Sequence, residues 1–245
     1  IRHPHRQRYT HKMASVVSVI TGGGTGIGAA LAKKLASQGQ NVFIVGRRSE
    51  PLLKTKASYP QAIHTVVADV TTEEGRTAVV RALEDAQCTH LSYLVHNAGV
   101  LGPVVSLEHV GVEEWRDHMA VNMEGPLFLT QALLPKLKAA ASTTTTTTTT
   151  GGARVLHISS GASQKPYRGW GPYCTSKAAL NMIYRVLREE LQPYNIHVGS
   201  VRPGVVDTPM QDQVRTCDSK SFPDLPRFQT LKEDGKLESP EKVAT

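Results

Sequence analysis

Several features that would assign this chain at once to a class of protein are scarce or missing. The 245 residues include only three cysteines, Cys88, Cys174 and Cys217, an odd and scattered set without the spacing of metal ligands or of a disulfide framework. The ten histidines form no H-E-x-x-H or comparable cluster, so no metal site is indicated. No apolar run approaches the roughly 20 residues that span a bilayer, and no signal-peptide core is present. We therefore expect a cytoplasmic protein with reduced thiols and no membrane segment.

Acidic residues are missing from the first twelve positions, where Arg2, Arg6, Arg8 and Lys12 lie. These four cations account for much of the net charge of +7, and the remaining chain carries only +3. No basic face interleaved with aromatic residues appears, so a nucleic-acid partner is not indicated. We expect residues 1–12 to be a basic, disordered extension without function, and Met13 to be the natural start. The alternatives are the tail of an organelle-targeting peptide and translated upstream sequence.

Short β-branched runs alternate with longer amphipathic stretches, which predicts parallel βαβ units. The expected fold class is α/β, a single-domain Rossmann-like doubly wound parallel sheet with helices on both faces. Strands are predicted at residues 16–21, 41–45, 64–68, 91–96, 154–159 and 197–201, and helices at 27–37, 73–86, 112–139 and 173–192. Because Pro126 and Pro135 lie inside the third of these helices, we expect a kink or an early end there.

Residues 143–150 are a run of threonine. Threonine is a poor helix former, so the run predicts a flexible insert. A segment that enters a strand lies at the N-terminal edge of the sheet, whereas open α/β sheets bind ligands at the carboxyl edge, so we expect the insert to lie far from the chemistry. Residues 241–245 look like the start of a helix. The expectation is one dinucleotide-binding catalytic domain over residues 13–245 that lacks its C-terminal end.

A glycine-rich segment, residues 21–28, lies between the first apolar run and a helical pattern. The start of a helix offers free N–H groups and a positive dipole end, which attract phosphate. The spacing Gly22, Gly26, Gly28 differs from G-x-G-x-x-G, and a glycine turn without a ligand is the simpler alternative. Arg47 and Arg48 end the second strand where NAD sites commonly carry an acid, which favours the 2′-phosphate of NADP(H); alternatively, one or both point to solvent.

Tyr173 and Lys177 stand four residues apart on one predicted helix, so both side chains reach the same ligand. A cation beside a phenol favours the phenolate, and we therefore expect Lys177 to lower the pKa of Tyr173. Tyr173 would then act as general acid in carbonyl reduction and as base in the reverse direction. A hydroxyl at the end of the fifth strand, from Ser160 or Ser159, would stabilise developing negative charge on the carbonyl oxygen.

These motifs together resemble the short-chain dehydrogenase/reductase family, from about Ser15 to the last residue. Residues 21–28 resemble its T-G-x-x-x-G-x-G turn, and residues 97–99 resemble its N-A-G. The resemblance implies four catalytic residues, Asn122, Ser160, Tyr173 and Lys177, in which Asn122 holds a water that links Lys177 to solvent. Its cofactor positions correspond here to Gly22, Thr25, Gly26, Ile27, Gly28, Asp69, Val70, Asn97, Ala98, Gly99, Tyr173, Lys177, Pro203, Gly204, Val206 and Thr208.

Within the family, residues 203–211, 231–237 and 239–241 are most similar to sepiapterin reductases and microbial benzil reductases. That similarity implies an NADPH-dependent carbonyl reductase of small, vicinal dicarbonyl compounds. Tyr167, Trp170 and Met210 would form an apolar pocket wall, or else pack the loops. The carboxylate that anchors the pterin in sepiapterin reductases would fall beyond Thr245.

Two other functions stay open. One is an oxidoreductase for a different alcohol or ketone, such as a sugar, a steroid or an acyl thioester. The other is a non-catalytic NADP-sensing regulator, although such a protein usually loses the tyrosine or the lysine. The family's helix-to-helix packing further implies a homodimer or homotetramer that forms through helices 112–139 and 173–192.

Overall fold

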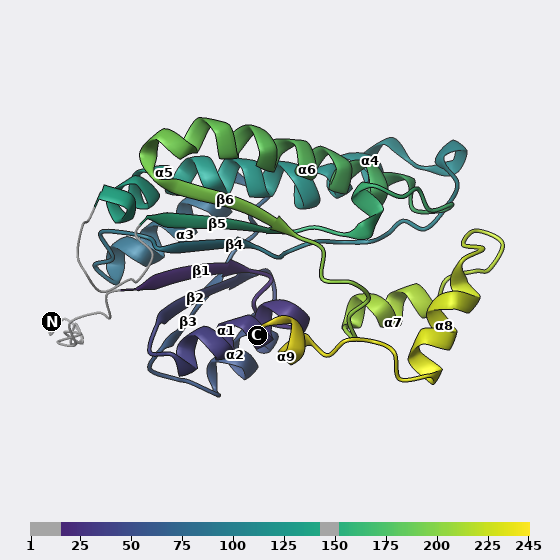
Figure 1. The fold of residues 1–245 in the computed structure, drawn as a ribbon, viewed down its shortest axis with the longest axis horizontal. Coiled ribbons are helices and arrows are strands. Elements are labelled where there is room, and N and C mark those ends of the chain that lie inside the picture. The colour runs from purple at the N-terminus through teal and green to yellow at the C-terminus, as the bar shows by residue number, and fades with distance from the viewer. Residues whose placement is uncertain (1–15, 143–151) are drawn as a thin grey trace, which may run out of the picture.

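A computed structural model describes residues 16–142 and 152–245 (Figure 1). The predictions for the basic extension, for Met13 and for the threonine run lie outside the described residues. None of the helices within these two ranges is long and apolar enough to cross a membrane.

Six parallel strands form the central sheet, in the order β3-β2-β1-β4-β5-β6. Their bounds are β1 Val17–Thr21, β2 Asn41–Gly46, β3 Ile63–Val67, β4 Tyr93–His96, β5 Ala153–Ile158 and β6 Ile196–Val201. The strand order reverses between β1 and β4, and ligands of open α/β sheets bind at the carboxyl edge near such a reversal. All six predicted strands are present within two residues of their expected bounds.

Helices cover both faces of the sheet (Figure 1). One face carries α1 (Gly26–Ser37) and α2 (Ser49–Lys56), and the other carries α3 (Glu73–Asp85), α5 (Gly125–Ser142) and α6 (Gly171–Leu191). Each face has its own apolar cluster, with Ile20 and Ile44 on the first and Leu94, Leu129 and Leu133 on the second. Because strands covered on both sides need apolar residues on both sides, they read as near-continuous apolar runs in the sequence. This architecture confirms the predicted fold class.

The long helix predicted at residues 112–139 is three helical segments in one run. They are α4 (Val112–Met119), a π-helical turn η2 (Ala120–Glu124) and α5. Pro135 lies inside α5 without ending it, so of the expected kink or early end, the early end does not occur. The buried side chains of Leu129, Leu133 and Leu137 hold α5 against the sheet, and this packing outweighs the hydrogen bond that a proline removes.

Three helices were not predicted: α2, α7 (Pro209–Arg215) and α8 (Leu225–Glu233). Helices α7 and α8 extend beyond the carboxyl edge of the sheet, at the right of Figure 1. They are held by an apolar cluster that includes Trp170, Val214, Phe222 and Phe228. The expected helix near the end of the chain is α9 (Pro240–Val243), which packs against α1.

Candidate active site

The glycine turn joins β1 to α1 through backbone shapes that glycine adopts readily. Gly22 and Gly26 have φ angles of +66° and +51°, in the left-handed region that disfavours other residues. A Cβ atom at Gly28 would collide with the carbonyl oxygen of Gly22 and lie 2.5 Å from Nδ2 of Asn97. The first turn of α1 therefore lies directly against the loop, so its free N–H groups are available to an anionic group there.

Asn97 fixes the shape of this turn from the end of β4. Its side-chain amide donates hydrogen bonds to the carbonyl oxygens of Thr21 and Gly22, at 3.0 and 3.1 Å. The hydroxyl oxygen of Thr21 in turn accepts hydrogen bonds from the backbone N–H groups of Asn97 and Ala98, at 3.1 and 3.0 Å. These four bonds join the two strands at the point where the strand order reverses.

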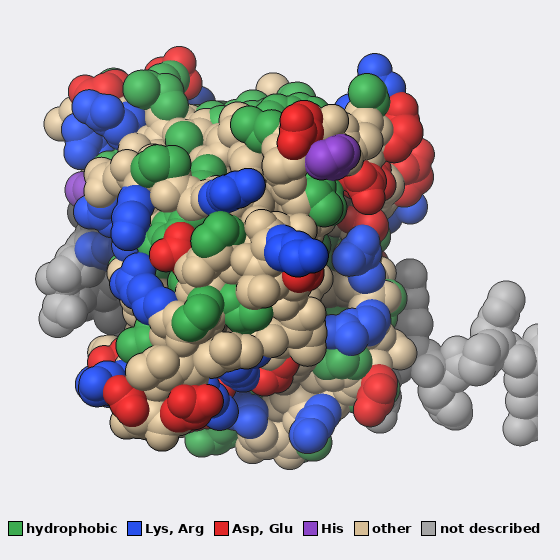
Figure 2. Space-filling model, turned by 90° about the vertical axis from the view of Figure 1, so that its right-hand side faces the viewer, with side chains coloured by type: hydrophobic (Ala, Val, Ile, Leu, Met, Phe, Trp, Pro, Cys, Tyr) green, Lys and Arg blue, Asp and Glu red, His purple; other side chains and the backbone are tan. Residues whose placement is uncertain are grey.

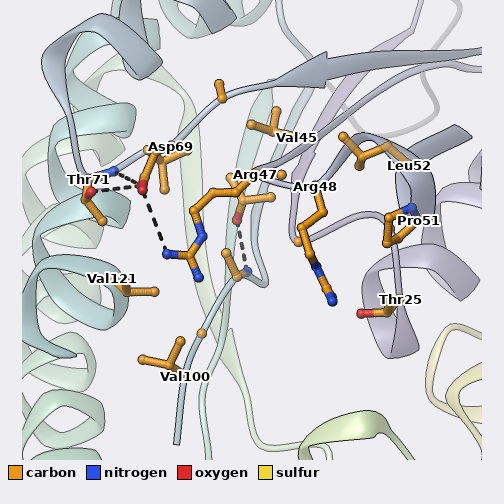
Figure 3. A pocket seen from close by; sticks show the side chains of 18 residues that line it. Thr25, Val45, Arg47, Arg48, Pro51, Leu52, Asp69, Thr71, Val100 and Val121 are labelled. Atoms are coloured by element: carbon orange, nitrogen blue, oxygen red, sulfur yellow. Dashed lines mark hydrogen bonds and ion pairs between the residues drawn. The ribbon is translucent and has the colours of Figure 1, made fainter. Parts of the chain in front are cut away.

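Arg47 and Arg48 line the same cavity as the glycine turn. This cavity of about 330 Å³ is bounded by the ends of β1 to β4 and by the loops that follow them; among its lining residues are Gly22, Thr25, Arg47, Arg48, Asp69, Val70, Ala98 and Gly99. Figure 3 shows the Arg47 side chain extended toward Asp69, and Arg48 extended toward Thr25. Arg47 Nη1 lies 3.9 Å from Asp69 Oδ2, and the Arg47 side chain is 64% exposed. The guanidinium groups thus remain accessible to a ligand.

Tyr173 and Lys177 lie one turn apart on α6, next to the end of β5. Both residues are buried, and Lys177 Nζ lies 5.7 Å from the centroid of the Tyr173 ring. Lys177 Nζ donates a hydrogen bond to the Ile158 carbonyl oxygen at 3.0 Å, so the end of β5 holds the ammonium in place. Burial lowers the pKa of Lys177 to about 8.

The expected direction of the Tyr173 pKa shift is wrong for the protein alone. Burial raises the pKa of Tyr173, and a hydrogen bond from Ser160 opposes the rise. A phenolate loses its hydration when buried, and here that cost exceeds the stabilisation that the neighbouring groups provide. The phenol is therefore held protonated, which is the form that a general acid requires.

The structure distinguishes the two serines that follow β5. Ser160 Oγ accepts the backbone N–H of Ala162 at 3.2 Å and is the hydroxyl that bonds Tyr173. Ser159 Oγ is buried and meets no hydrogen-bond partner within the described ranges. Ser160 is accordingly the residue that lies beside the phenol.

Asn122 lies within the π-helical turn, where the helix widens between α4 and α5. Its Oδ1 accepts the N–H of Val100 and its Nδ2 donates to the Val100 carbonyl oxygen, both at 2.9 Å. The same Nδ2 lies 3.1 Å from Ser176 Oγ. Single π turns inside α-helices are frequent at functional sites, and this one places Asn122 between the loop after β4 and the helix that carries Tyr173 and Lys177.

The segment after β6 lies next to the glycine turn. Gly204 has a φ angle of +80°, Val206 forms an isolated bridge with Glu238, and Thr208 precedes α7. A Cβ atom at Gly26 would lie 3.0 Å from Thr208 Cγ2. The predicted cofactor residues after β6 and those after β1 are thus brought together from opposite ends of the chain.

The three residues considered for a substrate pocket belong to one aromatic cluster beside Tyr173. Trp170 is 5% exposed, stacks on Phe222 with ring centroids 4.8 Å apart, and meets Tyr173 edge to face at 5.6 Å. Tyr167 and Met210 pack against the same cluster while remaining partly exposed. Trp170 therefore packs the lobe made by α7 and α8, and Tyr167 and Met210 remain partly exposed.

Figure 2 looks onto this carboxyl edge of the molecule. Lysine and arginine side chains are interspersed there with aspartate and glutamate rather than gathered into one basic field. The net charge of the chain is thus not concentrated over the site.

A family model described as short chain dehydrogenase matches residues 16–218. The chain belongs to the short-chain dehydrogenase/reductase family. It is therefore an oxidoreductase that acts on a carbonyl or alcohol group with a nicotinamide cofactor.

Individual relatives agree with the resemblance seen in the sequence. A benzil reductase ((S)-benzoin forming) from Bacillus cereus is 34% identical over 92% of this chain and 90% of its own length. A sepiapterin reductase from Xenopus laevis is 31% identical over 92% of this chain and 86% of its own. Among solved structures, the KRED1-Pglu enzyme superposes with a TM-score of 0.84 at 33% identity, covering 94% of this chain and 91% of the other.

Two parts of the site were not anticipated from the sequence. His118 bonds directly to Asn122, and the buried His96 of β4 and His157 of β5 stack on each other, with the Lys177 ammonium acting on His157. The spacing of His118 and Asn122, four residues on one helix, was a visible signal. The pair His96 and His157 has no such signal in the sequence, because the two rings meet across two strands that are far apart in the chain.

Proposed function

We propose that this protein is an NADPH-dependent carbonyl reductase whose substrate is a small vicinal dicarbonyl compound. The observation that carries the proposal is the position of Arg47 and Arg48, which line one cavity with the glycine turn at the end of a strand that offers no carboxylate. Guanidinium groups bind phosphate through paired, charge-assisted hydrogen bonds. An adenosine 2′-phosphate in that cavity is the group they would recognise.

The residues of the site fit a dinucleotide. Because Gly28 has no side chain, the first turn of α1 packs directly against the glycine turn. This packing lets the backbone approach a pyrophosphate closely. Arg47 and Arg48 would hold the 2′-phosphate, Asp69 and Val70 the adenine, and Lys177 the ribose hydroxyls. When bound, the nicotinamide supplies the hydride that adds to the carbonyl carbon.

The chain itself supplies the proton. The Tyr173 hydroxyl donates its proton to the carbonyl oxygen as negative charge develops there, and an alcohol results. With substrate bound, the Ser160 hydroxyl would turn its one hydrogen from Tyr173 to the same oxygen and lower the energy of that charge. The Lys177 ammonium stabilises the resulting phenolate. Lys177 exchanges protons with solvent through the region of Asn122, and this exchange returns a proton to Tyr173.

The substrate class is supported by the relatives. A second carbonyl next to the reacting one withdraws electrons and activates it, and benzil has this arrangement. The aromatic cluster around Trp170 and the exposed faces of Tyr167 and Met210 suit a flat, apolar substrate. Other ketones and alcohols of the family's range are the competing substrates.

Turnover and cofactor choice are tested in one set of measurements. NADPH consumption is followed with benzil, sepiapterin and simple monoketones, for the wild type and for Tyr173→Phe. Reduction of a dicarbonyl that is lost in Tyr173→Phe supports the proposal. Tight NADPH binding without reduction of any carbonyl would instead indicate a sensor.

The double variant Arg47→Ala/Arg48→Ala should weaken NADPH binding by about tenfold or more, because each charge-assisted bond contributes about 1.5–3 kcal/mol, and should change NADH binding little. Lys33→Ala/Lys34→Ala, on the exposed side of α1, is the control with the same change of charge. Equal losses for NADPH and NADH would refute the NADP assignment.

We also propose that the protein is a homodimer or homotetramer. Phe128 on α5 and Met182 and Val186 on α6 are 40%, 55% and 47% exposed, an apolar surface on the two helices that the family packs between subunits. Light scattering at micromolar concentration should give at least twice the mass of the chain. A monomer mass would contradict this assembly.

A further inference from the structure

His118 is a buried histidine with two hydrogen-bond partners that differ in kind. It lies in α4 and is 1% exposed. Its Nδ1 lies 2.8 Å from the carbonyl oxygen of Gly102, and its Nε2 lies 2.7 Å from Nδ2 of Asn122. Gly102 belongs to the loop after β4, so the ring joins that loop to the π turn.

The partners fix the tautomer of the ring. A carbonyl oxygen only accepts, so Nδ1 must carry the hydrogen. The amide nitrogen of Asn122 only donates, so Nε2 must be the unprotonated nitrogen and accept its N–H. A doubly protonated ring would set two donors against each other at 2.7 Å. The geometry is therefore compatible with one neutral tautomer of His118.

The charged and titratable groups around the ring favour the same state. Burial lowers the pKa of His118 and the Lys177 ammonium lowers it further, while the bond to Gly102 opposes them. Tyr173 meets the ring edge to face, with centroids 6.2 Å apart. Both ionisable groups come from α6, and His118 stays neutral beside them.

The contact determines how Asn122 uses its two amide hydrogens. Three acceptors surround Nδ2: the Val100 carbonyl oxygen at 2.9 Å, His118 Nε2 at 2.7 Å and Ser176 Oγ at 3.1 Å. Ser176 already donates to the Tyr173 carbonyl oxygen at 2.9 Å. His118 gives the shortest of the three contacts.

We propose that His118 is a positioning residue of the active site, and that its neutral Nδ1–H tautomer orients Asn122 by accepting the Asn122 amide N–H while bonded to the loop at Gly102. The inference rests on the proposed function, because His118 acts through Asn122 on the proton path between Lys177 and solvent. Its loss should therefore slow turnover and leave cofactor binding in place.

The tautomer is measured directly by long-range proton–nitrogen NMR of the full-length protein with labelled histidine, assigned by comparison with His118→Gln. At pH 7 the Nε2 of His118 should show the chemical shift of an unprotonated nitrogen and Nδ1 that of a protonated one. The opposite tautomer, or a doubly protonated ring, would overturn the proposal whether or not the protein turns over a substrate.

Steady-state kinetics with NADPH and benzil test the consequence. His118→Phe keeps an aromatic ring beside Tyr173 but removes both hydrogen bonds, and it should lower kcat about ten- to a hundredfold with the NADPH dissociation constant unchanged. His118→Gln offers an amide oxygen to Asn122 and an N–H to Gly102, and it should recover most of the lost kcat. His197→Phe, at an exposed position of β6, is the matched control and should behave as the wild type.

The outcomes separate the two proposals. A wild type that binds NADPH but reduces no carbonyl contradicts the proposed function, and the tautomer measurement still decides the role of the ring. An active wild type with an equally active His118→Phe contradicts the positioning role alone. A folded His118→Gln variant that is as slow as His118→Phe also contradicts the positioning role, because the glutamine oxygen would then accept the Asn122 N–H without restoring turnover. If His118→Phe does not fold, the NMR measurement and His118→Gln decide the question.

Discussion

His96 on β4 and His157 on β5 stack inside the protein, with ring centroids 4.8 Å apart. His96 Nε2 lies 2.7 Å from the hydroxyl of Thr130, which itself donates to the Pro126 carbonyl oxygen, so the His96 ring donates from Nε2. Neither ring nitrogen of His157 has a hydrogen-bond partner in the part of the chain that the structure describes. Two imidazoles in such a place cannot both accept a second proton without great cost, and acid should therefore unfold the protein.

The pKa shifts give the size of this effect. Burial lowers the pKa of His157 from 6.5 to about 4, and the Lys177 ammonium adds to the shift. Burial lowers the pKa of His96 well below its usual value, and His157 lowers it further. Because the folded pKa lies below the unfolded one, the unfolded chain binds more protons throughout the window from about pH 6.5 to pH 4. Stability is complete above that window and falls as the pH decreases through it.

Between pH 7 and pH 5 the linkage for His157 alone amounts to about 2 kcal/mol of unfolding free energy. His96, whose pKa is also lowered by burial, adds to this loss in the same direction. For a protein whose whole stability is about 5–15 kcal/mol, that loss is large enough to move a denaturant midpoint clearly.

Urea unfolding at pH 7 and pH 5, followed by circular dichroism, measures the loss. His157→Phe keeps a flat ring against His96 and removes one titrating group, so its loss between the two pH values should be smaller than that of the wild type by about 2 kcal/mol. Any change of packing caused by the larger ring acts at both pH values and cancels in the comparison. His197→Phe removes an exposed imidazole and should keep the pH dependence of the wild type. If His157→Phe and the wild type lose the same free energy, the buried pair is not what makes the fold sensitive to acid.

Three further predictions concern the site. Gly28→Ala should abolish tight NADPH binding because its Cβ collides with the turn, whereas Gly199→Ala, whose Cβ would lie 3.8 Å from Leu156 Cδ1, should bind normally; calorimetric titration compares them, and normal binding by both would refute the close packing. Thr21→Val leaves two N–H groups without their acceptor and should lower thermal stability by about 2 kcal/mol or more, while Thr21→Ser keeps the hydroxyl and most of that stability; equal melting curves for the two variants would argue against the bonds. The rate of carbonyl reduction should fall as the pH rises through about 8, where Lys177 loses its proton, and a flat rate up to pH 10 would show that its charge is not needed.

Much of the fold follows from the sequence for a simple reason. Strands covered on both faces are apolar at most positions, so residues such as 17–21 and 41–46 stand out without any knowledge of their neighbours. The glycine turn is equally visible, since positive φ angles and close contacts leave glycine as the residue that fits. Both features are properties of a short stretch of chain.

The three helices that were not predicted, α2, α7 and α8, depend instead on the residues against which they pack. Helix α2 is eight residues long and buries only Leu52 and Thr55, too little apolar surface to produce a clear helical period. Helices α7 and α8 bury Val214, Leu225 and Phe228 in the lobe beside Trp170, and this packing exists only once the chain has folded. Short helices are marginal on propensity alone, so the sequence of each is a weak guide.

The same distinction applies within the active site. The spacing of Tyr173 and Lys177 on one helix was enough to bring them together, but the sign of the Tyr173 pKa shift depends on burial, which no spacing reports. Asn122 was predicted as a site residue on an ordinary helix, yet its amide is held by Val100, His118 and Ser176 from three separate segments. The contact with His118 follows from helical spacing, whereas those with Val100 and Ser176 join segments that are distant in the sequence. A motif thus identifies which groups react, whereas the protonation state and orientation of each group are set by contacts that form only in the folded protein.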